Sequence, residues 1–278
     1  MKKTIRNKPA GCSSLVRLVA VSLVLAGMIV PAQAQRAIRG RITRMDGTTV
    51  DGQLRWMPRS REYLVMDSEG RRYTVAERQV RDVRVMPPPR WKDIVNAFQA
   101  KQYPRVIKPL QSIMEEYIRM QYDVPAASML TQAYMAIGQP AEAIKSAEVA
   151  ISRNPNVWQD MDFARVYWQA LAQAKSPKLR SVLQEAIERG SRETAAAAQV
   201  MRGNIDFDQG RYREALVDGY LRVIMLFKNV QQVQPEALYK AVRAHEQLGE
   251  HSHAEKFRRI LLSEYPRSSY SRDLRSGN

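Results

Sequence analysis

The chain has 278 residues, which is enough for one or two domains with a hydrophobic core, and 45% of its residues are hydrophobic. Its formal net charge is +16, from 44 basic and 28 acidic residues. The single cysteine, Cys12, excludes a disulfide within the chain. Because Cys12 lies in a predicted leader, thiol catalysis is also excluded from the mature protein.

The first 34 residues have the features of a secretory signal peptide. Lys2 and Lys3 belong to a basic start, residues 18–30 are uncharged and mostly apolar, and Ala32 and Ala34 form a small-x-small cleavage pattern. An uncleaved anchor is the alternative, but this apolar run is shorter than the roughly 20 residues that span a bilayer. We therefore predict export and cleavage after Ala34.

Residues 35–86 alternate with the two-residue period of strands. Each alternating set is predicted to line the apolar face of the sheet. The sets are Ile38 and Ile42; Val50, Leu54 and Trp56; Leu64 and Met66; Tyr73 and Val75; and Val83 and Val85. Turn signals such as Asp46-Gly47 and Glu69-Gly70 separate these sets. The region looks like an SH3-like or Sm-like barrel, closed or half closed, and residues 87–90 are predicted to be a proline linker.

From Trp91 onward the apolar period is that of helices, and residues 125–155 show it most clearly. Two apolar stripes flank a break at Gly138 and Pro140, where a glycine cap ends one helix and a proline begins the next. Five such helix pairs follow one another over residues 91–270, and residues 271–278 are predicted to be a flexible tail. Helix pairs at this spacing are typical of an α-solenoid.

These residues resemble tetratricopeptide repeats. The matching positions are Gly203, Asn204, Gly210, Tyr212, Glu214, Ala215 and Leu216; Tyr134, Gly138, Ala143, Ala150 and Pro155; and Gly249, Ala254 and Pro266. The resemblance implies a mainly α fold in which the first helix of each pair lines a concave groove for a polypeptide. The segment from Glu264 to Ser268 is also similar to repeat ends of bacterial envelope assembly and coordination proteins, and this similarity implies a periplasmic location.

Position by position, the resemblance implies a set of groove residues. They are Trp91 and Phe98; Gln132 and Met135; Arg165 and Trp168; Asn204 and Phe207; and Tyr239, Lys240 and Arg243. Aromatic and arginine side chains are favoured at interface centres, although the same rings could instead pack between helices. A more specific hypothesis is that Asn204, Lys240 and Arg243 grip a carboxylate of the partner.

The sequence contains no motif for an enzyme. His251 and His253, beside Glu250, could bind a metal ion, but they lie in a predicted turn where polar residues are expected. Asp160 and Asp162 stand at a helix start, where capping explains them. We therefore predict a non-enzymatic scaffold without cofactor or metal.

The β region carries an excess of positive charge. Residues 35–90 contain thirteen arginines, seven acidic residues and no lysine. For an exported protein this charge favours anionic lipid, a cell-wall polymer or an acidic protein over nucleic acid. The alternative function is therefore an envelope adaptor tethered through this region, and an ordinary solvated surface would give the same pattern.

Overall fold

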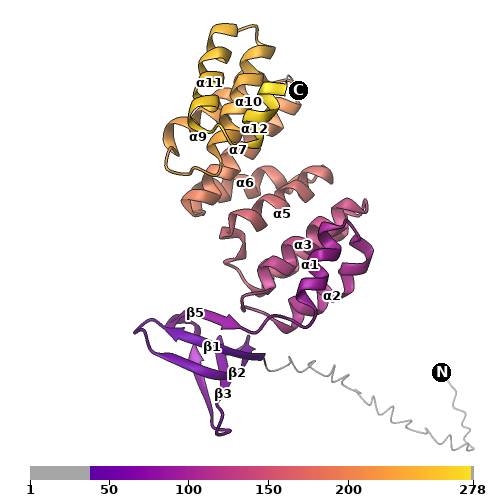
Figure 1. Cartoon of the computed structure of the whole chain (residues 1–278), viewed down its shortest axis with the longest axis vertical. Helices are drawn as coiled ribbons and strands as arrows, with labels where there is room; N and C mark the ends of the chain where they lie inside the picture. Colours follow the sequence, from indigo (N-terminus) through magenta and orange to yellow (C-terminus); the bar gives the residue numbers. More distant parts are fainter. Residues whose placement is uncertain (1–37, 277–278) are drawn as a thin grey trace, which may run out of the picture. The chain divides into compact units, whose positions relative to one another are not determined.

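The computed structural model describes residues 38–276, which belong to one compact unit. The predicted signal peptide, Cys12 and the cleavage site at Ala34 lie outside the described residues. A small antiparallel sheet is followed by helices that make up most of the chain (Figure 1). The predicted fold class, mainly helical after a small all-β part, is confirmed at this level.

The sheet has five strands in the order β4-β3-β2-β1-β5. Their bounds are β1 (Ile38–Arg44), β2 (Thr49–Met57), β3 (Glu62–Met66), β4 (Arg72–Ala76) and β5 (Val80–Val85), with a 3₁₀ turn, η1 (Glu77–Gln79), before β5. The edge strands β4 and β5 do not pair with each other, so the sheet is open. Of the closed and half-closed barrels that the sequence predicted, the closed one is therefore wrong. Alternation shows which residues face a core, whereas closure depends on strand tilt and stagger, which alternation does not encode.

One face of the sheet is buried. Its buried residues are Ile38, Ile42, Leu54, Trp56, Tyr63, Val65, Val75 and Val85. In β3 the buried residues are Tyr63 and Val65, which corrects the expectation that Leu64 and Met66 mark the inner face. Because four consecutive residues of β3 are apolar or aromatic, alternation could not identify its inner face.

The helical region begins at Trp91, directly after the predicted proline linker. Its helices are α1 (Trp91–Gln99), α2 (Tyr103–Glu116), α3 (Asp123–Ala136), α4 (Pro140–Arg153), α5 (Met161–Gln173), α6 (Lys178–Arg189), α7 (Arg192–Asp208), α8 (Tyr212–Glu214), η3 (Ala215–Tyr220), α9 (Leu221–Leu226), α10 (Gln234–Gln247), α11 (His251–Glu264) and α12 (Ser269–Ser276), with a 3₁₀ turn, η2 (Val157–Gln159), before α5. Each helix packs against its neighbour in the chain, and successive pairs also contact each other, as α3 contacts α5 and α7 contacts α10. No helix within residues 38–276 is long and apolar enough to cross a membrane.

The predicted break between α3 and α4 is confirmed. Gly138 has a φ of +75°, the left-handed conformation that glycine adopts without strain, and Pro140 opens α4. Ala127 of α3 and Ala143 and Ala147 of α4 are fully buried, so small side chains allow the two helices to approach closely. The same glycine conformation recurs at Gly210 and Gly249.

The fourth pair contains a π-helical turn, η3, that the sequence did not indicate. A Cβ added at Gly219 would lie 2.5 Å from the Cα of Gly203, so the two glycines mark a close crossing of η3 with α7. The carbonyl of Asp218 accepts hydrogen bonds from the side chains of Gln199 and Arg202 on α7. These bonds satisfy a backbone acceptor where the α-helical pattern is broken.

Within the described residues, the predicted flexible tail is wrong for residues 271–276, which belong to a helix. Residues 269–276 form α12, in which Ser271 and Leu274 are buried. Tyr270 lies against Tyr239 of α10 with ring centroids 5.4 Å apart. An apolar helix face was not apparent because Leu274 is surrounded in sequence by serine, arginine and aspartate.

Polar and aromatic contacts join the sheet to the helices. The hydroxyl of Tyr63 donates to the carbonyl of Arg119, at 2.7 Å, in the connection between α2 and α3. The Arg119 guanidinium pairs with Glu77 and lies 5.1 Å from the centroid of Trp56. The backbone N–H of Arg119 donates to the carboxylate of Asp123.

Candidate functional site

Three helices contribute to a polar cluster that contains two of the predicted groove residues. Arg165 of α5 donates to Glu236 Oε2 of α10 at 2.5 Å. Asn204 of α7 donates from Nδ2 to Glu236 Oε1 at 3.2 Å. Glu236, which sequence reasoning did not select, therefore holds the two predicted residues together.

Asn204 is fixed from its other side. The hydroxyl of Tyr220, at the end of η3, donates to Asn204 Oδ1 at 2.9 Å. Tyr220 is fully buried, and burial together with nearby acidic groups raises the pKa of its hydroxyl well above the ordinary value. The hydroxyl thus remains a donor, and the chain Tyr220–Asn204–Glu236–Arg165 is hydrogen-bonded throughout.

Trp168 lies beside this cluster but is only 2% exposed. It lines a cavity of about 40 Å³ together with Arg165, Asn204 and Glu236. This volume suits about one water molecule and cannot hold a side chain of a partner. For Trp168, packing therefore explains the position better than direct partner contact.

The remaining predicted residues of α7 and α10 also have neighbours within the chain. The Lys240 ammonium lies 5.2 Å from the centroid of Phe207, which in turn meets the edge of Tyr212. Arg243 lies 3.6 Å from Glu246. Phe207, Lys240 and Arg243 are half-buried. Tyr239 packs against Tyr270 of α12, as described above.

The hypothesis of a carboxylate grip can now be judged by geometry. Asn204 already donates to Glu236, Lys240 lies over Phe207, and Arg243 is near Glu246. A partner carboxylate would have to replace these contacts. The carboxylate that lies between Arg165 and Asn204 is the chain's own.

The predicted residues of the first two pairs lie outside this cluster. Trp91 packs edge-on against Tyr122, with centroids 5.2 Å apart, and Phe98 packs edge-on against Tyr103 at 5.6 Å. Gln132 and Met135 are half-buried on α3. Among the eleven predicted residues, Arg165 and Asn204 are thus joined through Glu236, Trp168 lines the same small cavity, and Lys240 lies over Phe207.

Among the described residues, His245, Glu250 and His253 form a group whose ligand atoms lie within 4.8 Å of one another. His245 Nδ1 lies 2.7 Å from Glu250 Oε2, and Arg213 pairs with the other oxygen of the same carboxylate. The rings of His245 and His253 are stacked at an interplanar angle of 17°, whereas a shared metal must lie in both ring planes. The arrangement favours a packed turn between α10 and α11 over a metal centre. His251, which the sequence singled out, is not in the group.

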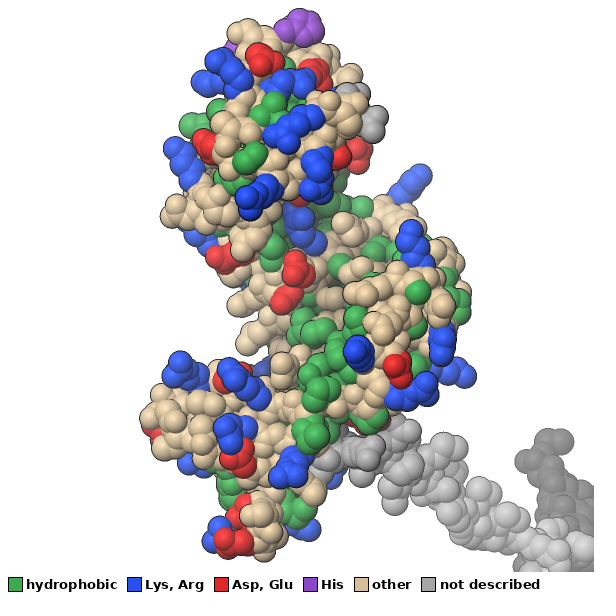
Figure 2. All heavy atoms as spheres, in the orientation of Figure 1, with side chains coloured by type: hydrophobic (Ala, Val, Ile, Leu, Met, Phe, Trp, Pro, Cys, Tyr) green, Lys and Arg blue, Asp and Glu red, His purple; other side chains and the backbone are tan. Residues whose placement is uncertain are grey.

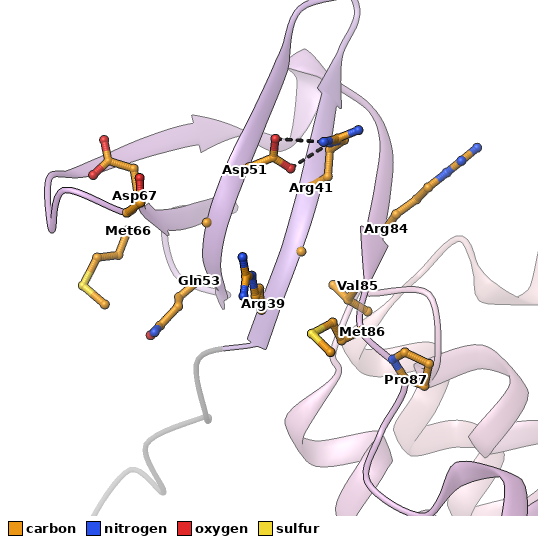
Figure 3. A pocket seen from close by; sticks show the side chains of 13 residues that line it. Arg39, Arg41, Asp51, Gln53, Met66, Asp67, Arg84, Val85, Met86 and Pro87 are labelled. Carbon is orange, nitrogen blue, oxygen red and sulfur yellow. Dashed lines mark hydrogen bonds and ion pairs between the residues drawn. The ribbon is translucent and has the colours of Figure 1, made fainter.

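A second candidate site lies on the β region, and sequence reasoning did not find it (Figure 3). A hollow of about 970 Å³ is lined by β1, β2, β5, the end of β3 and the start of the proline linker. Its polar lining includes Arg39, Arg41, Asp51, Gln53, Asp67 and Arg84, and its apolar lining includes Met66, Val85, Met86 and Pro87. Lys and Arg side chains are exposed around this end of the molecule (Figure 2).

Two of the residues that line the hollow are glycines in paired positions of β1 and β2. Gly40 pairs with Gly52 across β1 and β2. A Cβ at Gly40 would lie within 3.0 Å of Arg84 O and of Val85, and one at Gly52 would overlap Met66 O. Because side chains alternate along a strand, Gly40 shares the buried face of Ile38 and Ile42. The missing side chains leave room for Val85 and Leu54 beside Gly40 and for Val65 beside Gly52, on the face opposite Arg39 and Arg41.

Comparison with known proteins gives no direct assignment: neither a family model, nor a curated protein, nor a solved structure matches this chain.

Proposed function

We propose that the chain is an exported, non-enzymatic scaffold of the tetratricopeptide-repeat type that holds an extended polypeptide against the first helices of its pairs. The proposal includes a periplasmic location and a role in bacterial envelope assembly or coordination. It also includes the view that the open sheet is a variant of an SH3-like module.

Two sets of contacts on α5, α7 and α10 carry this proposal: Arg165 and Asn204 joined through Glu236, and Lys240 over Phe207. A fixed guanidinium, amide, lysine and aromatic ring on adjacent helices give a partner polar and apolar contacts at one place. The order of contacts, in which each helix pair packs on the next, supports the solenoid interpretation. The glycine–proline break and the glycines before α8 and α11 support the repeat type.

Photo-crosslinking in an envelope fraction tests the proposal. A crosslinking residue at Gln132 or Met135 of α3, or at Gln169 of α5, is expected to capture the same partner. Glu185 of α6 provides the control, because it is an exposed position on a second helix. Capture of the same partner with equal yield from Glu185 would contradict the proposed binding face.

A second candidate function, an adaptor tethered to anionic lipid or cell-wall polymer, is supported by the charge of the β region. Arg39, Arg59, Arg61 and Arg72 are exposed. Binding to anionic vesicles or cell-wall fragments should then weaken as salt is added, because exposed charges are screened within about 10 Å at 0.1 M salt. Retention that does not respond to salt would count against this candidate.

A further inference from the structure

The hollow on the β region joins arginines to an apolar wall, and neither function above uses this combination. We propose that it binds an extended acidic peptide segment that also carries apolar side chains. The proposal adds a second binding site to the chain. It would replace the lipid or polymer tether as the role of the β region.

The basic part of the hollow is set by the register of the strands. Arg41 stands directly opposite Arg84 on β5 and opposite Asp51 on β2. Like charges at directly opposed positions disfavour a sheet, and here each arginine is partly compensated by an acid, Arg41 by Asp51 at 2.7 Å and Arg84 by Asp82 at 2.9 Å. Arg39 is exposed and forms no ion pair within residues 38–276, although its charge helps to lower the pKa of Asp51, so its guanidinium can meet a carboxylate of a ligand.

The apolar part consists of flexible side chains. Met66 continues the cross-strand row that begins with Arg39 and Gln53, and Figure 3 shows the three side chains coming from adjacent strands. Met86 is 58% exposed at the start of the linker. Methionine adapts to different apolar partners, and these two thioethers give a ligand contacts that a uniformly charged polymer could not use.

Other anionic ligands fit less well. The lining contains no aromatic side chain, whereas binding of single-stranded nucleic acid depends on aromatic stacking platforms. A bilayer presents a broad surface, and a hollow between strands does not match it.

Fluorescence anisotropy with the full chain tests the proposal. The probe is a short labelled peptide of alternating glutamate and leucine, and the comparison peptides replace leucine by serine or glutamate by lysine. We expect Arg39→Glu to weaken binding of the glutamate–leucine peptide by about tenfold or more, as expected for loss of an arginine–carboxylate contact. Met86→Ser should weaken it by a smaller factor and should leave the already weaker glutamate–serine peptide unchanged.

Matched controls separate this site from general charge and from the helical face. Arg59→Glu makes the same charge change in a turn outside the hollow, and Lys240→Glu alters the group on α10. Both variants should retain the affinity of the unmodified chain. An equal loss with Arg59→Glu, a loss with Lys240→Glu, or unchanged binding with Arg39→Glu would overturn the assignment. Equal or tighter binding of the glutamate–serine peptide, polyphosphate or anionic vesicles would overturn the peptide specificity.

Discussion

Arg165 and Glu236 are separated by 71 positions in the sequence and form a 2.5 Å ion pair between α5 and α10. The side chain of Glu236 is 12% exposed and that of Arg165 is 32% exposed. The pair therefore lies at the boundary between core and surface. It links the third and fifth helix pairs, and Asn204 adds the fourth.

Replacing Glu236 by alanine should destabilise the protein by about 1–3 kcal/mol, because it leaves the Arg165 and Asn204 donors without their acceptor. Urea unfolding measures the loss. Glu142→Ala is the control, since Glu142 lies 3.8 Å from Lys145 in an exposed pair that should contribute no more than about 0.5 kcal/mol. Losses of equal size would show that the cluster does not stabilise the packing of α5, α7 and α10.

Gly219→Ala should lower the free energy of unfolding by about 1–3 kcal/mol, because the added methyl group would meet Gly203 at the crossing of η3 and α7. Val217→Ala, in the same π-helical turn but 55% exposed, should change it by no more than about 0.5 kcal/mol. Thermal unfolding of both variants makes the comparison. A neutral Gly219→Ala would mean that the two helices can separate at no cost.

Asp123 should make stability depend on pH. Burial raises the pKa of its carboxyl to about 6 from 3.8, and this effect outweighs the hydrogen bonds from Arg119 and Val124, which favour the ionised form. A carboxyl whose pKa is raised on folding stabilises the folded protein at pH values below the pKa that this carboxyl has in the unfolded chain. That contribution is lost as the pH rises through the folded pKa.

Between about pH 4 and pH 6 the free energy of unfolding should therefore fall by up to about 3 kcal/mol through this group, at about 1.4 kcal/mol per pKa unit. Asp123→Asn carries no titratable carboxyl and should flatten the pH profile over that range. The comparison uses the slope of stability against pH, since the amide also changes the local hydrogen bonds. Parallel profiles for the two proteins would show that the pKa of Asp123 is not raised.

The contact between sheet and helices should depend on Arg119 more than on Arg61, although both pair with Glu77. The Arg119 side chain is 10% exposed and lies against Trp56, whereas that of Arg61 is 70% exposed. Arg119→Ala should cost about 2 kcal/mol or more, and Arg61→Ala no more than about 1 kcal/mol. Hydrogen exchange in β3 and at residues 119–123 would locate the effect, and similar exchange in both variants would contradict it.

Local patterns were sufficient for the break between α3 and α4. The spacing of Leu130 and Tyr134, the glycine at Gly138 and the proline at Pro140 together define a helix, its end and the next start. The cap predicted at Asp160 is also present at the start of α5. The Asp160 carboxylate accepts a hydrogen bond from the N–H of Phe163 at 2.9 Å. These features depend on residues within a few positions of one another, and a single sequence contains them.

The candidate sites could be predicted only in part. Arg165 and Asn204 were selected by resemblance to repeat positions, but Glu236, which joins them, was not. Met66 was assigned to the buried face of its strand, and in the structure it lines the hollow beside Gln53 and Arg39. In both cases the sequence did not show which distant segment of the chain lies next to the residue.

By itself, the sequence determined the order of strands and helices, the residues at which helices break, and the positive charge of the β region. The tertiary structure decided that the sheet stays open, that η3 is π-helical against Gly203, and that residues 269–276 form a helix. The physical reason is that periodicity and capping act over a few residues, whereas closure, close crossings and shared carboxylates depend on contacts between segments far apart in the chain.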